Sequence, residues 1–169
     1  EKAGKALREK RPFPDINTVF KTTGMAMLNS MGGASGVIFG SMFLGGIKGL
    51  SPLSVLDGDG FTCIMRGSLE AIKARGKANV GDKTMVDALE PAVIAMETSD
   101  RSDLTALLGT AAKAAEEGVE NTKNYIARFG RAKSLMERAI GYQDAGATSV
   151  SILITSMYRY LQELQKTEG

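Results

Sequence analysis

The chain has 169 residues, of which 43% are hydrophobic and 24% charged, a composition typical of a folded globular protein and not of a disordered one. Its net charge of +2, from 21 basic and 19 acidic side chains, is too balanced for the broad basic surface that nucleic-acid binding requires. Histidine is absent and Cys63 is the one cysteine, which excludes histidine-dependent nucleophiles, internal disulfides and zinc sites with imidazole ligands.

Length and composition also limit the number of domains that we expect. We expect a single domain over residues 1–169, because nothing in the composition marks a second one. Residues 1–15 are charged rather than apolar, and no run of about 18 uncharged apolar residues follows them. The sequence therefore predicts a cytoplasmic protein without a membrane partner.

The first half of the chain is predicted to be helical. Apolar residues recur at helical spacing and the alternation typical of strands is missing, so the predicted class is all-α. Helices are expected at 2–9, from Asp15 as a cap to about 30, at about 34–48 and at 61–75, with a turn-rich connector at 51–60 and an end at Gly76. The inward side chains of the second helix are predicted to be Ile16, Val19, Phe20, Met25 and Leu28.

Glycine is unusually frequent in the third predicted helix. Residues 34–48 contain four glycines, each of which costs about 1 kcal/mol relative to alanine in a helix interior. So much glycine requires either close helix packing or contact with a ligand.

The second half of the chain contains three predicted helices and one long loop. The helices are expected at 84–96, with Pro91 as a kink, at about 104–126 after the cap Asp103, and at 147–165. Residues 127–146 lack a helical pattern, and a break of about twenty residues inside a compact domain is typical of a functional loop. We expect its apolar residues to anchor it on the core, namely Phe129, Leu135, Met136 and Ile140.

Three segments place glycine or small polar residues directly before a helix. Unpaired backbone N–H groups there meet the positive end of the helix dipole, an arrangement that binds phosphate. The segments are 31–36 (MGGASG), 80–84 (VGDKT) and 144–149 (DAGATS). A plain helix cap explains each one singly, but three together with a basic loop favour an anion or nucleotide site. None of them is a Walker A or Rossmann sequence.

The order of residues in these loops is a more specific signal than their glycine content. The segments 29–40 (NSMGGASGVIFG), 75–89 (RGKANVGDKTMVDAL) and 130–149, which ends in IGYQDAGATS, resemble the three signature loops of the L subunit of dihydroxyacetone kinase. The resemblance covers essentially the whole chain, with the loops in order and at fitting distances. It implies an up-and-down barrel of antiparallel α-helices with ADP or ATP bound across the loops at one end.

The resemblance also implies a function and its partners. The chain would be a phosphotransferase subunit whose nucleotide supplies a phosphoryl group to a ketose bound on a partner subunit. A stand-alone chain of this type favours the version linked to the phosphotransferase system, with a phosphocarrier as a second partner. No catalytic side chain is implied here, since phosphoryl transfer relies mainly on positioning and charge stabilisation.

Residues are carried over where this sequence matches the family loops. The phosphate contacts implied are Gly32, Gly33, Ala34, Ser35 and Arg131. Gly76, Thr84 and Met85 are implied to line the nucleotide, with Met85 as an apolar plate against the adenine. Asp144 and Gly146 are implied to close over the base or ribose.

One family element has no counterpart in these residues. The family holds two magnesium ions on an acidic loop, Asp-x-x-x-x-Asp-x-Asp-Gly, and alignment on Gly24 puts Glu1 in the helix that follows this loop. We therefore expect a longer protein that binds Mg2+ through residues outside this chain. The segment 57–60 (DGDG) has a sequence similar to part of this acidic loop, but a turn with a helix cap explains it.

Two other functions stay open. A related kinase domain could serve another acceptor, a fatty acid or a four-carbon sugar, and residues 143–149 (QDAGATS) favour the sugar. A non-catalytic relative could instead act as a regulator or scaffold. The presence or absence of the three aspartates in the full-length sequence separates this last function from the kinase subunit.

Overall fold

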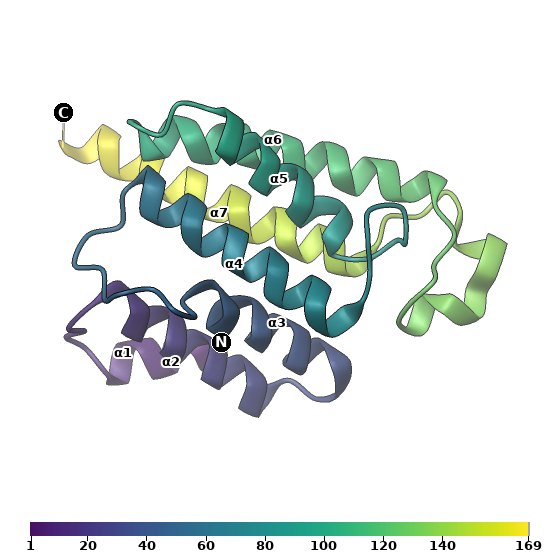
Figure 1. The fold of residues 1–169 in the computed structure, drawn as a ribbon, viewed down its shortest axis with the longest axis horizontal. Helices are drawn as coiled ribbons and strands as arrows, with labels where there is room; N and C mark the ends of the chain where they lie inside the picture. Colours follow the sequence, from purple (N-terminus) through teal and green to yellow (C-terminus); the bar gives the residue numbers. More distant parts are fainter. Residues whose placement is uncertain (169) are drawn as a thin grey trace. The chain divides into compact units, whose positions relative to one another are not determined.

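The computed structural model describes residues 1–168, except for the side chains of Arg131 and Glu168, and its regular structure is helical (Figure 1). No strand occurs in residues 1–168, which confirms the predicted all-α class. The chain divides into two compact units, Glu1–Lys77 and Ala78–Gly169, each described by itself below. The single domain expected over residues 1–169 stays a prediction. No helix in the described part of the chain is long and apolar enough to cross a membrane.

The first unit holds four helices that pack on one another in chain order. They are α1 (Lys2–Glu9), α2 (Ile16–Ser30), α3 (Gly33–Gly46) and α4 (Gly58–Gly76). The predicted cap of α2 is confirmed, because the Asp15 carboxylate accepts a hydrogen bond from the N–H of Thr18 at 2.6 Å. Asp57 caps α4 in the same way, accepting from the N–H of Gly60 at 2.8 Å. The acidic segment 57–60 therefore forms the cap and the first turn of α4.

Close packing accounts for glycines on both sides of α3. A Cβ atom built on Gly40 would lie 3.1 Å from the carbonyl oxygen of Gly24, so the backbones of α2 and α3 nearly touch. Near the end of α3, a Cβ on Gly46 would lie 2.8 Å from the carbonyl oxygen of Ile64 on α4. At these positions a side chain would force the helices apart, which is the packing reason that the glycine content required.

The same close approach explains an error in the predicted core. Met25 and Leu28 were expected to face inward, but both are exposed. The buried residues of α2 are instead Thr22, Thr23 and Gly24, whose small side chains allow α3 to come close. Hydrophobic periodicity alone assigned the inner face to the bulkier residues.

The second unit contains α5 (Val86–Thr98), α6 (Leu104–Asn121) and α7 (Ala145–Glu168), which pack pairwise. Pro91 lies inside α5, and Asp103 caps α6 as predicted, through bonds from the N–H groups of Thr105 and Ala106. Helix α6 ends before the predicted 126 and continues as the 3-10 turn Thr122–Asn124. The core of this unit consists of fully buried side chains, including Leu89, Val93, Met96, Leu107, Ala111, Val150 and Ile154.

The long loop before α7 contains a 3-10 segment, Arg131–Ala139, and does not use its large apolar side chains as anchors. Phe129, Leu135, Met136 and Ile140 are all exposed, Met136 by 67%, so the expected anchoring is wrong. The buried residues of the loop are Ala127 and Ala139. Because the three helices already close the core, backbone hydrogen bonds hold the loop, among them Gly141 N–H to the Lys123 carbonyl at 2.7 Å.

A substitution at Gly118 tests the close contact between α5 and α6. A Cβ there would lie 2.1 Å from the carbonyl oxygen of Asp87, a backbone atom that can move only with its helix. We expect Gly118→Ala to lower the free energy of unfolding by about 1–3 kcal/mol. On the same helix, Gly109→Ala meets only the Tyr158 ring, at 3.1 Å, and should stay close to wild type. Thermal denaturation compares the two, and equal melting temperatures would contradict the backbone contact.

Candidate functional site

The loop that precedes α5 is shaped by one buried carboxylate. Asp87 is 1% exposed and accepts hydrogen bonds from the N–H groups of Gly81 and Thr84, both at 2.6 Å. The Thr84 hydroxyl in turn accepts from the N–H of Val86 at 3.2 Å. Asp87 therefore holds the turn that precedes α5, and the Thr84 hydroxyl adds one bond to the first N–H of the helix. Burial raises the pKa of Asp87 above its ordinary value, although its bonds from backbone N–H groups oppose the shift.

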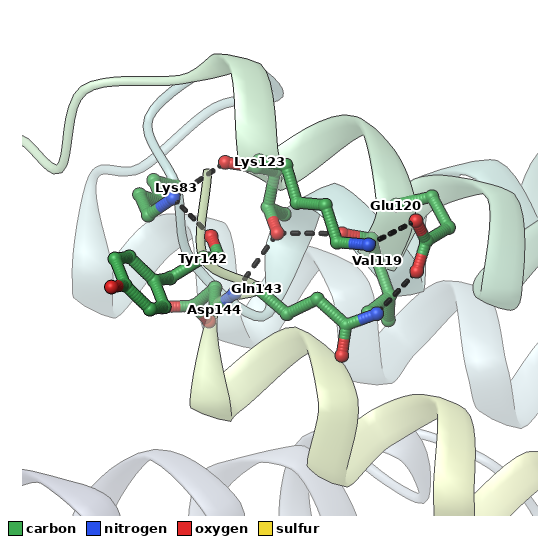
Figure 2. Close-up of polar contacts among 8 residues, drawn as sticks. Lys83, Val119, Glu120, Lys123, Tyr142, Gln143 and Asp144 are labelled. Atoms are coloured by element: carbon green, nitrogen blue, oxygen red, sulfur yellow. Dashed lines mark hydrogen bonds and ion pairs between the residues drawn. The ribbon is translucent and has the colours of Figure 1, made fainter. Parts of the chain in front are cut away.

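Lys83, in the middle of this loop, points into the protein. It is 3% exposed, and its ammonium donates to the carbonyl oxygens of Thr122 and Tyr142, each at 2.6 Å (Figure 2). Burial lowers the pKa of Lys83, while the negative charges of Asp144 and Asp87 oppose the shift. One cation therefore joins the loop before α5 to the end of α6 and to the loop before α7.

Asp144 caps the first turn of α7. Its carboxylate accepts from the N–H of Ala147 at 2.8 Å, and its own N–H donates to the Thr122 hydroxyl at 2.9 Å. That hydroxyl donates onward to the Val119 carbonyl at 2.6 Å (Figure 2). Burial raises the pKa of Asp144. The start of α7 is thus tied to the end of α6 through the side chain of Thr122.

A second group of polar contacts lies on the outside of this network. The Glu120 carboxylate accepts from Gln143 and forms an ion pair with Lys123, whose Nζ lies 2.6 Å from Oε2 (Figure 2). Asp82 accepts from the N–H of Asn79 at 2.8 Å and lies 3.4 Å from the Arg128 guanidinium. These contacts also attach the long loop to α6 and to the loop before α5.

The first helix start, in the first unit, is built differently. Helix α3 follows Gly32, and within the described residues no side chain caps it. Gly33 has a left-handed φ of +68°, and a Cβ on Gly32 or Gly33 would meet no described atom within 4 Å. Ala34 and Ser35 are exposed. The N–H groups at this end are therefore open to an anion.

The structure brings together part of the predicted nucleotide set. In the second unit, a Cβ on Gly146 would lie 3.3 Å from the backbone N of Met85, so the loops before α5 and α7 adjoin. Met85 is 7% exposed, so only a small part of its side chain is accessible to a ligand. Arg131 begins the 3-10 segment, and its side chain lies outside the described structure. Gly76 is the last residue of α4, in the first unit with residues 32–35.

Three residues that organise the second unit, Lys83, Asp87 and Thr122, were not singled out from the sequence. Asp87 carries a usable signal, because Thr-x-x-Asp before an apolar run is typical of a helix start. Lys83 and Thr122 carry none, since the bonds of Lys83 reach 39 and 59 positions along the chain.

The described residues do not fit a metal centre. No group of three or more Asp, Glu, His or Cys side chains in residues 1–168 could hold an ion. Three aspartates in the loops and helix starts around Lys83, namely Asp82, Asp87 and Asp144, each accept hydrogen bonds from backbone N–H groups.

Comparison with known proteins agrees with the loop resemblance. The model of the DAK2 domain matches residues 1–159. The chain belongs to the DAK2 domain family. It is 39% identical over 153 residues to the ADP-binding subunit DhaL of the PEP-dependent dihydroxyacetone kinase 1 of Listeria innocua, covering 90% of this chain and 72% of that protein. The corresponding DhaL subunit of Escherichia coli is 38% identical over 142 residues, covering 83% of this chain and 68% of that protein.

A solved structure supports the fold of this DAK2 domain. The crystal structure of the dihydroxyacetone kinase of C. freundii matches with a TM-score of 0.67 at 23% identity. The match covers 91% of this chain and 26% of that one. At this identity the likeness concerns the helical fold alone.

The burial of Asp87 predicts a pH dependence with a definite sign. Its pKa is raised in the folded protein, so its contribution to stability is complete below the ordinary value of 3.8 and is lost as pH rises through the folded value. Asp87→Asn does not titrate. We expect the wild-type melting temperature minus that of Asp87→Asn to be largest near about pH 3.5 and to fall toward about pH 7. A difference that grows with pH would contradict the effect of burial.

Proposed function

We propose that this chain carries ADP or ATP on its glycine loops as the nucleotide-binding subunit of a dihydroxyacetone-type kinase. The phosphoryl group would pass from the nucleotide to a ketose bound on a partner subunit. The observation that carries this proposal is the open start of α3, where exposed residues 32–35 leave backbone N–H groups without a side-chain cap. The relatives named as ADP-binding subunits support the same ligand.

The phosphates would lie at the open start of α3. Gly32 and Gly33 have no side chain to obstruct an approaching oxygen, and a Cβ at either position would meet open space in the described structure. The N–H groups of Ala34 and Ser35 belong to the first turn, where the helix dipole favours negative charge. Fixed donors of this kind stabilise charge in phosphoryl transfer without reorganising.

The adenosine half would contact the capped loops of the second unit. The Thr84 hydroxyl accepts from Val86 but keeps its proton for a ligand. The Asp144 carboxylate uses part of its acceptor capacity on the N–H of Ala147, and its other lone pairs suit a ribose hydroxyl. Gly146 lies close against Met85, where a Cβ would be 3.3 Å from the Met85 backbone N, and Gly76 completes the predicted set.

The remaining charges would come from Arg131 and from magnesium. A guanidinium presents several donors in one plane, which suits a phosphate. Magnesium, which the family resemblance implies, would neutralise the phosphate oxygens, but residues 1–168 contain no group of side chains that fits it.

The donor and partners follow from the same family. The relatives named as PEP-dependent suggest that phosphoryl groups reach ADP from a phosphocarrier of the phosphotransferase system, and their designation as subunits suggests a separate ketose-binding subunit. We place the protein in the cytoplasm, where phosphorylated metabolites and nucleotides are available. We assign it no nucleic-acid or membrane partner.

The ligand is tested on the purified full-length protein. We expect about one ADP per chain after native purification, measured by chromatography of the acid-released nucleotide. Phosphoenolpyruvate with the phosphotransferase components should then support phosphorylation of dihydroxyacetone, without added ATP, in the presence of the ketose-binding subunit. Free exchange with ATP would indicate the ATP-dependent version, and bound nucleotide without transfer a non-catalytic relative. No binding of either nucleotide with magnesium present would contradict the proposal.

The phosphate role of Arg131 has a matched control in the same 3-10 segment. We expect Arg131→Ala to weaken ADP binding by about tenfold or more, because a charge-assisted hydrogen bond contributes about 1.5–3 kcal/mol. Arg138→Ala removes an exposed arginine from the other end of the segment and should change affinity less than about twofold. Calorimetric titration measures both, and equal affinities of the two variants would remove Arg131 from the site.

A further inference from the structure

Lys83 stands in a glycine loop next to Thr84, the setting in which a lysine commonly faces a phosphate. The structure places its ammonium elsewhere. The side chain is 3% exposed, and two of its three N–H donors bond the carbonyl oxygens of Thr122 and Tyr142 at 2.6 Å. Both acceptors are protein backbone, and they lie in different segments of the second unit (Figure 2).

The backbone of Lys83 is held in an uncommon conformation. Its φ is +58°, in the left-handed region that residues other than glycine rarely adopt. The neighbouring Gly81 also has a positive φ, of +96°, so the loop reverses direction around residues 81–83. This reversal accompanies the inward placement of the ammonium.

We propose that Lys83 is a positioning residue that clamps the loop 139–143 against the loop 79–85. The clamp sets the spacing between the two segments that would line the adenosine, because Tyr142 directly precedes residues 143–146 and Lys83 directly precedes Thr84. The inference rests on the proposed function, since this spacing matters to a ligand that touches both loops.

The contacts of the neighbouring residues localise the effect of removing the clamp. Without the ammonium, the carbonyl oxygens of Thr122 and Tyr142 lose a charged donor, a loss that is costly inside a protein. The start of α7 keeps its own tie, because the N–H of Asp144 still donates to the Thr122 hydroxyl. Release should therefore concern residues 139–143 more than residues 144–148.

Charged side chains lie near Lys83 in the segments that pack against it. Asp87 on α5 and Asp144 at the start of α7 are the carboxylates that act on it. Asp82 pairs with Arg128, and Glu120 at the end of α6 pairs with Lys123. The phenol of Tyr142 is exposed.

The first test compares Lys83→Met with Lys113→Met, which removes an exposed lysine from α6 in the same unit. Hydrogen exchange of the nucleotide-free proteins should show residues 139–143 exchanging about tenfold faster in Lys83→Met, with residues 104–121 unchanged. Calorimetry should show ADP binding weakened about tenfold. Lys113→Met should match wild type in both measurements.

The second test measures ADP affinity as a function of pH, which separates a positioning role of Lys83 from a role in stability alone. Because burial lowers the pKa of Lys83, wild-type affinity for ADP should begin to fall at a lower pH than the titration of an ordinary lysine would give, whereas Lys83→Arg, charged throughout, should not show this fall. A fall of equal size at the same pH in Lys83→Arg would overturn the proposal.

The outcomes also separate this inference from the proposed function. If wild type binds no ADP, the proposed function fails, and faster exchange of residues 139–143 in Lys83→Met still supports the clamp. If wild type binds ADP and Lys83→Met binds it equally, with unchanged exchange, the clamp is refuted and the proposed function stands.

Discussion

The two 2.6 Å hydrogen bonds from the Lys83 ammonium to the carbonyls of Thr122 and Tyr142 are the contact on which the loops of the second unit depend. Around them, Asp87 shapes the loop before α5 and Thr122 ties Asp144 to the end of α6. The helices supply an apolar core but do not fix the loops between them. Backbone hydrogen bonds, such as Gly141 N–H to the Lys123 carbonyl, and the buried charges hold these loops together, and a buried charge is costly unless it is hydrogen-bonded.

The helix starts of the predicted site divide into two kinds. Those of α5 and α7 are satisfied by the protein's own side chains, Thr84 with Asp87 and Asp144, so their backbone donors are largely used. The start of α3 has no side-chain cap in the described structure and lies beside open glycines. This difference matches the division proposed for the ligand, with phosphates at α3 and the less charged adenosine at the capped loops.

Much of the fold followed from sequence because its signals are local. The caps Asp15 and Asp103, the helical periodicity and the loop wording were sufficient for the class and the family. The errors arose where tertiary packing overrides periodicity, as at Met25 and Leu28 beside the small face of α2, and at the exposed Met136. Lys83 escaped prediction because its partners are distant in sequence, and the contributions of the ten predicted site residues stay predictions until a ligand is observed.

The most direct test of the proposed nucleotide site is the footprint of ADP on the wild-type protein, measured by amide hydrogen exchange with and without nucleotide. We predict slower exchange at residues 32–36, where the open N–H groups of α3 would meet phosphate, together with slower exchange at residues 81–86 and 144–148. ADP binding that leaves residues 32–36 unprotected, or that protects only segments outside these loops, would contradict this placement of the ligand.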